Sequence, residues 1–193
     1  MEEGAILIVG VGGVGCIWAT QAHSRCQDLS ELLLIDADET SFEGASTANC
    51  LFLDAGGEGR GSAALPMMAT HRLREGLDSV MPLIEKAEIM LILTGLGGGM
   101  GSGASSEIAS VAKNRGCLVL SIAGLPFAEQ PLRRSIANEA ISGLDSNSKM
   151  SHEMAKESPK GLSKIIDNEA HMMAYIAPAK LNPVIKDFLQ QNE

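Results

Sequence analysis

Short apolar runs recur along the chain, and longer stretches of mixed apolar and polar residues separate them. Runs of this kind, bounded by glycine or by polar turn residues, are typical of buried β-strands. The predicted strands are Ala5–Val9, Leu32–Ile35, Cys50–Leu53, Ile89–Leu93, Leu118–Ile122 and Leu162–Ile166.

Helical patterns fill most of the intervals between these runs. After residue 103, Ala104, Ile108, Val111 and Ala112 share one helical face. Pro66 suits the first turn of a helix, whereas Pro82 is expected to break or kink one. The predicted helices are Gly10 to about Ser24, about Leu65 to Lys86, the segment after Gly95–Gly103, about Pro131–Leu144 and Asn182–Gln191.

Strands that alternate with helices predict an α/β fold, a three-layer Rossmann-like arrangement in which helices cover both faces of a mostly parallel sheet. The polar segment Asp145–Gly161 is predicted to be a surface insertion within a single domain. Ligands of such sheets bind beyond the carboxyl ends of the strands. The loops expected at that edge are Gly10–Gly15, Asp36–Asp38, Gly95–Gly103, Gly124–Gln130 and Asp167-Asn168.

Composition and charge make some classes of function less suitable for this chain. The net charge of −9 argues against broad binding of nucleic acid, which needs basic side chains, but backbone N–H groups still allow a nucleotide ligand. No apolar run reaches the length of a membrane span, and the acidic start Met1–Gly4 does not resemble a signal peptide, so a cytoplasmic protein is expected. The four cysteines form no Cys-x-x-Cys pair and are expected to be reduced, and the histidines show no metal-ligand spacing.

Two glycine-rich segments carry the candidate chemistry. The first glycine loop, Gly10–Gly15, matches the dinucleotide fingerprint G-x-G-x-x-G, and Asp36 or Asp38 lies at the distance expected of a ribose-binding acid. The second glycine loop, Gly95–Gly103, is no P-loop because no lysine follows its last glycine. Two runs of exposed N–H groups at one sheet edge would suit a di- or triphosphate.

The sequence "GGGMGSG" at Gly97–Gly103 resembles the G-G-G-T-G-[ST]-G signature of the tubulin/FtsZ superfamily. Further stretches resemble other motifs of that family, in the same order: "GVGGVG", "GRGSAALP" at Gly59–Pro66, "LPFAEQPLRR" at Leu125–Arg134 and "IIDNEA" at Ile165–Ala170. The resemblance covers roughly Ala5 to Asn168 and implies that the ligand is GTP or GDP with Mg²⁺.

The resemblance also implies roles for individual residues. The first loop would approach the alpha- and beta-phosphates through Gly12, Gly13, Val14 and Gly15. The second would cradle the beta- and gamma-phosphates through Gly97, Gly98, Gly99, Met100, Gly101, Ser102 and Gly103. Gly61, Ser62 and Ala63 would lie near the gamma-phosphate, Glu129 near the ribose, Arg133 or Arg134 beside the nucleotide, and Asn168 at the guanine edge.

Several positions depart from the family pattern. Met100 replaces the usual threonine, Ile17 stands where an asparagine or glutamine is usual, Asp36-Ala37-Asp38 replaces Asn-Thr-Asp, and Glu129 comes one position early. The chain ends at Glu193 without an Asn-x-Asp-Phe-Ala-Asp-like stretch, which in the family completes the active site of a neighbouring subunit.

The resemblance therefore predicts one nucleotide-binding domain over residues 1–193, ending in or just after the family's central helix. No catalytic residue is assigned, and weak or no GTP hydrolysis is expected. The protein would regulate or co-assemble with a cell-division or cytoskeletal filament. Its expected partner is a longer paralogue or a second copy.

Two other interpretations stay open at this point. "ILIVGVGGVG" followed by "LLLIDAD" also resembles the opening of ATP-dependent adenylating enzymes of the ubiquitin-activating type, although that class has no need of Gly97–Gly103. The departures at Ile17 and Met100 also allow a scaffold that has lost nucleotide binding.

Overall fold

A single parallel sheet of five strands forms the centre of the described structure. The computed structural model describes residues 6–45, 48–53 and 65–157, and for 145–157 it describes the backbone alone. The strand order is β3-β2-β1-β4-β5, and every neighbouring pair is parallel. The strands are β1 (Ile6–Val11), β2 (Ser30–Asp36), β3 (Asn49–Phe52), β4 (Ile89–Gly95) and β5 (Leu118–Gly124).

These strands confirm the predicted ones up to residue 124, with small shifts at their ends. The helices are α1 (Gly12–His23), α2 (Pro66–Gly76), α3 (Met81–Lys86), α4 (Gly99–Asn114) and α5 (Pro131–Glu157), with short 3-10 turns η1 (Gln27–Leu29), η2 (Glu39–Phe42) and η3 (Leu77–Ser79). The predicted strand Leu162–Ile166 and helix Asn182–Gln191 lie outside the described residues.

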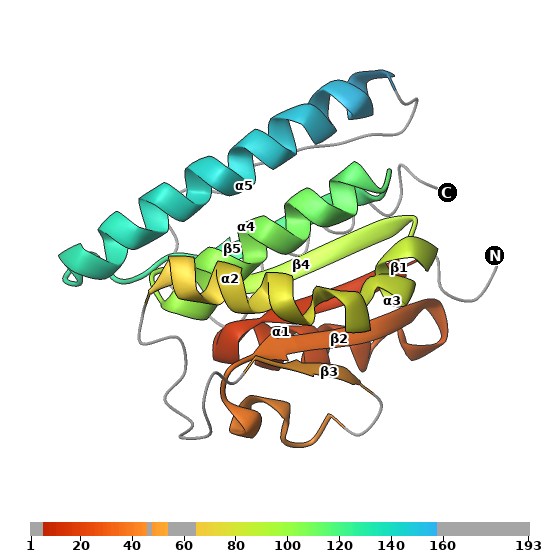
Figure 1. Ribbon diagram of the computed structural model, residues 1–193, viewed down its shortest axis with the longest axis horizontal. Helices are drawn as coiled ribbons and strands as arrows, with labels where there is room; N and C mark the ends of the chain where they lie inside the picture. Colours follow the sequence, from red (N-terminus) through yellow and green to blue (C-terminus); the bar gives the residue numbers. More distant parts are fainter. Residues whose placement is uncertain (1–5, 46–47, 54–64, 158–193) are drawn as a thin grey trace.

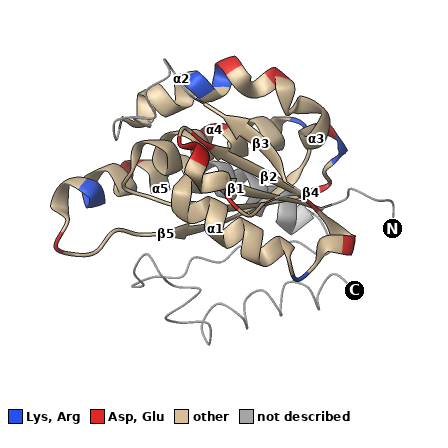
Figure 2. Ribbon diagram, turned by 90° about the horizontal axis from the view of Figure 1, so that it is seen from below, with Lys and Arg blue, Asp and Glu red and all other residues tan. Residues whose placement is uncertain are grey.

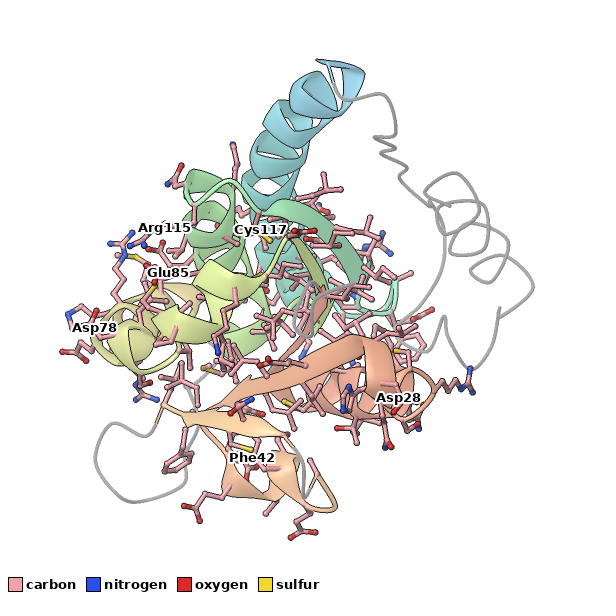
Figure 3. The ribbon with its side chains drawn as sticks, turned by 90° about the vertical axis from the view of Figure 1, so that its right-hand side faces the viewer. Asp28, Phe42, Asp78, Glu85, Arg115 and Cys117 are labelled. Carbon is pink, nitrogen blue, oxygen red and sulfur yellow. The ribbon has the colours of Figure 1, made fainter. Side chains whose placement is uncertain are left out.

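Helices cover both faces of the sheet, as predicted. Successive side chains of a strand point to opposite faces, so Ile8 joins one apolar cluster and Leu7 joins the other. Of the described helices, α1 packs with Trp18 on the face of the sheet that carries Ile8. Helices α2, α3, α4 and α5 cover the opposite face, which carries Leu7. Figure 3 shows Asp28, just after α1, and Asp78, just after α2, on opposite sides of the molecule.

Two helices differ from their predicted bounds. The segment expected as one helix from Leu65 to Lys86 is divided at η3, before Pro82, which instead occupies the first turn of α3. That position tolerates proline because the N–H it lacks would have no helical partner. Helix α5 continues to Glu157, well past the predicted end at Leu144 (Figure 1). The serines and asparagine of this part are only weakly unfavourable in a helix.

Most charged side chains of the described residues lie on the outside of the fold, and Asp36 is buried. Figure 2 shows charged positions on the outer helices α2 and α3. Arg74 of α2 holds Glu107 of α4 through two hydrogen bonds of 2.7 and 2.9 Å. Arg115, just after the C-terminal end of α4, pairs with Glu85 of α3, and the two are labelled side by side in Figure 3. None of the helices that the structure describes has the length and apolar character needed to cross a membrane.

The sheet topology brings the carboxyl ends of the strands to one edge. Val11 at the end of β1 lies between Ile35 of β2 and Thr94 of β4, and Gly95 lies beside Gly124 of β5. The chain leaves β1 into α1 on one face, and it leaves the adjacent β4 into α4 on the other face. Such a point of reversal is where open α/β sheets bind ligands.

Candidate nucleotide site

The two glycine loops meet at this edge. Gly12 has a φ of 74°, which favours glycine, and a Cβ added there would lie 3.3 Å from the backbone nitrogen of Gly101. The same added atom would lie 3.7 Å from the Cβ of Met100. The first turns of α1 and α4 therefore lie so close across the ends of β1 and β4 that a side chain at Gly12 would touch Gly101.

A buried threonine ties the two turns together. The hydroxyl oxygen of Thr94 lies 3.1 Å from the carbonyl oxygen of Val11 and 3.1 Å from that of Gly101. Its side chain is fully buried. Thr94 was not predicted from the sequence, because it stands near the end of an apolar strand and belongs to no glycine motif.

Several glycines are explained by close packing rather than by a ligand. A Cβ on Gly101 would lie 2.1 Å from the carbonyl oxygen of Gly95, and one on Gly103 would lie 2.0 Å from that of Pro66. A Cβ on Gly15 would lie 2.3 Å from the carbonyl oxygen of Leu93. These glycines let α4 approach β4 and α2, and let α1 approach β4, more closely than any side chain would permit.

The second glycine loop is therefore only partly a loop. Helix α4 begins at Gly99, so the prediction of a loop through Gly103 is wrong for its second half. The side chain of Met100 is 6% exposed and packs in the apolar core. The hydroxyl of Ser102 accepts the N–H of Gly97 at 2.9 Å and so fixes the turn before the helix. What this segment presents at the sheet edge is chiefly backbone.

The space beside the N-termini of α1 and α4 is open at two glycines. A Cβ on Gly98, the N-cap of α4, would have no neighbour among the described residues within 4 Å, and Gly13 of α1 is exposed. The first N–H groups of a helix have no partner within the helix, and they carry the positive end of its dipole. Neither α1 nor α4 has an acidic residue in its first turn. Together these turns form a site suited to the oxygens of a phosphate chain.

Two carboxylates lie on the β2 side of the site. Asp36 is buried, and its carboxylate accepts the N–H of Ala37 at 2.7 Å and the hydroxyl of Ser41 at 2.5 Å. Burial raises the pKa of Asp36 above its usual value, although these two hydrogen bonds oppose the shift. The exposed Asp38 accepts the N–H and the hydroxyl of Thr40, which lowers its pKa. Both side chains thus have partners in their own turn, and their predicted role at a ribose stays a prediction.

A thiol lies beneath the first glycine loop. Cys16 is fully buried in α1, and its sulfur lies 3.6 Å from the carbonyl oxygen of Gly10. Burial, reinforced by the nearby Asp36, raises the pKa of the Cys16 thiol to about 12. The thiolate form is therefore scarce near neutral pH, and Cys16 is suited to packing rather than to nucleophilic chemistry.

The start of α5 reaches the other side of the site. A Cβ on Gly97, whose φ is 91°, would lie 2.6 Å from the Cγ of Pro126 and 3.1 Å from the Cβ of Arg133. Arg133 and Glu129 are exposed there. The remaining predicted site residues lie outside the described part of the chain: Gly61, Ser62, Ala63 and Asn168.

Comparisons with known proteins agree with this geometry. Residues 5–155 match the model of the Tubulin/FtsZ family, GTPase domain. Cell division protein FtsZ 1 of Archaeoglobus fulgidus is 29% identical over 141 residues, which cover 72% of this chain and 38% of that protein. Cell division protein FtsZ of Mycoplasmopsis pulmonis is 31% identical over 141 residues, which cover 72% and 36% of the two chains. The matched part thus spans well under half the length of these relatives.

Solved structures show the same fold. An FtsZ structure from M. jannaschii superposes with a TM-score of 0.65 at 20% identity, covering 80% of this chain and 53% of that one. A protofilament of TubZ from bacteriophage PhiKZ superposes with a TM-score of 0.70 at 15% identity, covering 97% and 55%. At such identities the likeness concerns the fold.

Proposed function

Because the chain belongs to the tubulin/FtsZ family, as the match over residues 5–155 shows, we propose that it binds a guanine nucleotide, GTP or GDP, where α1 and α4 begin. The observation that carries the proposal is the close approach of Gly12 to Gly101, where an added Cβ would lie 3.3 Å from the Gly101 nitrogen. It brings the N-termini of two helices together, and one phosphate chain would contact both. Two such starts suit a phosphate chain better than a single phosphate.

The residues present fit a phosphate chain through their backbone. The amides of Gly12 and Gly13 would hold one part of it, and those from Gly98 to Met100 another. Arg133, exposed beside the second loop, would add a positive charge. Mg²⁺ bound with the nucleotide would neutralise phosphate charge, and this ion commonly uses phosphate oxygens, water and only one or two carboxylates. Glu129 and Asn168 would contact the ribose and the base.

Assembly and hydrolysis are the less direct part of the proposal. The relatives include cell division proteins, and TubZ is seen as a protofilament. We infer that this protein acts in the cytoplasm with a second copy or a longer relative, as a regulator or component of a cell-division or cytoskeletal filament. Phosphoryl transfer depends on positioning and on charge stabilisation. Residues 1–193 contain no stretch that resembles the acidic one implied for this step by the family resemblance.

Hydrolysis by the purified chain alone is therefore expected to be slow. The measurement is phosphate release from GTP with Mg²⁺, with and without a full-length FtsZ as partner. Release by the chain alone at several turnovers per second, which is within the ordinary range of enzymes, would contradict this part of the proposal.

Nucleotide binding is tested by titrating labelled GDP, GTP and ATP into the purified protein. Gly98→Val places a side chain in the open space before α4, where an added Cβ meets no atom of the described residues within 4 Å. We expect it to weaken GDP and GTP binding by about tenfold or more, the loss of one or two hydrogen bonds to a charged group, while the protein stays folded.

The matched control introduces the same residue elsewhere on the surface. Gln21→Val changes an exposed position of α1 that lies about two turns beyond its start, and it should leave the affinity unchanged. A clear preference for ATP would favour the adenylating-enzyme interpretation. Absence of binding by all three nucleotides would favour a scaffold.

A further inference from the structure

We propose that Asp36 sets the affinity of the site for anions: its buried carboxylate stands beside the first turn of α1 and opposes a bound phosphate chain, so the site binds nucleotide more tightly when this carboxyl is neutral. The inference rests on the proposed nucleotide binding. It adds a dependence on protons that the phosphate-binding amides would not produce by themselves.

The position of the carboxylate carries the argument. A Cβ added to Gly13 would lie 3.8 Å from one carboxylate oxygen of Asp36 and 3.5 Å from the hydroxyl oxygen of Ser41. The exposed Gly13 belongs to the first turn of α1, whose N–H groups are the proposed phosphate ligands. A negative charge is thus held within a few ångströms of the place where another is to bind.

The surroundings fix this charge and do not neutralise it. Asp36 is only 6% exposed, and its two hydrogen bonds, to Ala37 and Ser41, hold its side chain in place. The titratable group that acts on it is Asp38 of its own turn. Asp36 in turn acts on the thiol of Cys16 from α1. From β3, Cys50 acts in turn on Cys16. Among the described residues no cation forms an ion pair with Asp36.

The sign of the pH effect follows from these contacts. The folded protein holds the pKa of Asp36 above its usual value, because burial disfavours the charged form. A bound phosphate chain adds a like charge and raises that pKa further. Affinity should therefore rise as the pH falls through the pKa of Asp36, and it should be lowest where the carboxylate is fully ionised.

The test compares GDP and GTP binding by the wild-type chain and by Asp36→Asn at constant excess Mg²⁺, from pH 8 to pH 5.5. The asparagine keeps the shape and can still bond Ala37 and Ser41. At pH 8 we expect the variant to bind about tenfold more tightly, the scale of one like charge at roughly 6 Å in a partly screened site. The ratio of the two affinities should fall towards one as the pH drops, and this ratio cancels the titration of the nucleotide itself.

Two further variants complete the test. Asp28→Asn removes the same charge from an exposed side chain in η1, before β2 and outside the proposed site, and should change the affinity less than about twofold. Ser41→Ala removes a hydrogen bond that lowers the pKa of Asp36, so the fall in affinity should move to higher pH, and this result does not depend on the folding of Asp36→Asn.

The outcomes separate this inference from the proposed function. Equal or weaker binding by Asp36→Asn at pH 8 would overturn the inference. Equal binding would mean that the carboxylate has no effect on the nucleotide, and weaker binding would mean that it helps to hold the nucleotide. An equal gain in Asp28→Asn would also overturn it by attributing the effect to net charge. If neither the wild-type chain nor any variant binds GDP or GTP at any pH, the proposed function fails, and this inference fails with it.

Discussion

Replacing Gly101 by alanine is expected to destabilise the protein by about 3 kcal/mol, the upper end of the usual cost of overpacking. The new Cβ would lie 2.1 Å from the carbonyl oxygen of Gly95 and 2.8 Å from the hydroxyl oxygen of Thr94. The closer of these is backbone at the end of β4, which cannot move without disturbing the centre of the sheet. The better helix propensity of alanine returns only about 1 kcal/mol. Urea unfolding followed by circular dichroism measures the difference.

Gly98→Ala is the matched control for this experiment. The residue lies three positions earlier in the same glycine run, but a Cβ there meets no atom within 4 Å in the part of the chain that the structure describes. We expect a loss below about 1 kcal/mol, in the range of a changed N-cap. Similar small losses for both variants would mean that α4 does not approach β4 as closely as described.

Leu96→Ala is the second change expected to have a large effect, a loss of about 3 kcal/mol in the free energy of unfolding. Deletions of fully buried leucine side chains typically cost 2–5 kcal/mol. Leu96 is fully buried in the larger apolar cluster, and its N–H donates to the carbonyl oxygen of Gly124 at 2.8 Å. Because it anchors the turn before Gly97 and Gly98, its loss should also weaken nucleotide binding. Urea unfolding and a GDP titration on the same samples measure both effects.

Leu132→Ala provides the comparison for this leucine. The side chain of Leu132 lies at the start of α5 and is 83% exposed. Its removal should change the free energy of unfolding by less than about 0.5 kcal/mol. A loss of similar size in both variants would show that the core does not hold the turn at Leu96.

Most of the fold follows from local sequence patterns. Two apolar runs, Ala5–Val9 and Leu32–Ile35, predict β1 and β2. They do so because strands buried in a parallel sheet are nearly continuous in apolar residues. The order of the strands and the reversal between β1 and β4 are not local properties. A break or kink of the predicted helix at Pro82 was expected, and the helix is indeed divided, but the division lies at η3, before Pro82. Proline does not mark the place of a break exactly, because it is tolerated in the first turn of the next helix.

The candidate site was harder to predict because its glycines serve two purposes. Gly101 and Gly103 look like phosphate ligands in the sequence, but the atoms that exclude a side chain from them belong to Gly95 and Pro66. The second of these contacts joins segments far apart in sequence, and no local pattern reveals it. The turn contacts of Asp36 and Asp38 had a local signal, since hydroxyl residues follow them at Thr40 and Ser41.

The pairing of β1 with β4 also governs when the binding edge can exist. Thr94 reaches Val11 across a sequence separation of 83 residues. During synthesis the ribosome must therefore release the chain beyond Gly95 before the first turn of α1 acquires its counterpart. Contacts of such long range form slowly. A nascent protein would expose the inner edge of β1 for all of that interval, and a chaperone that shields exposed strand edges would have its chief substrate there.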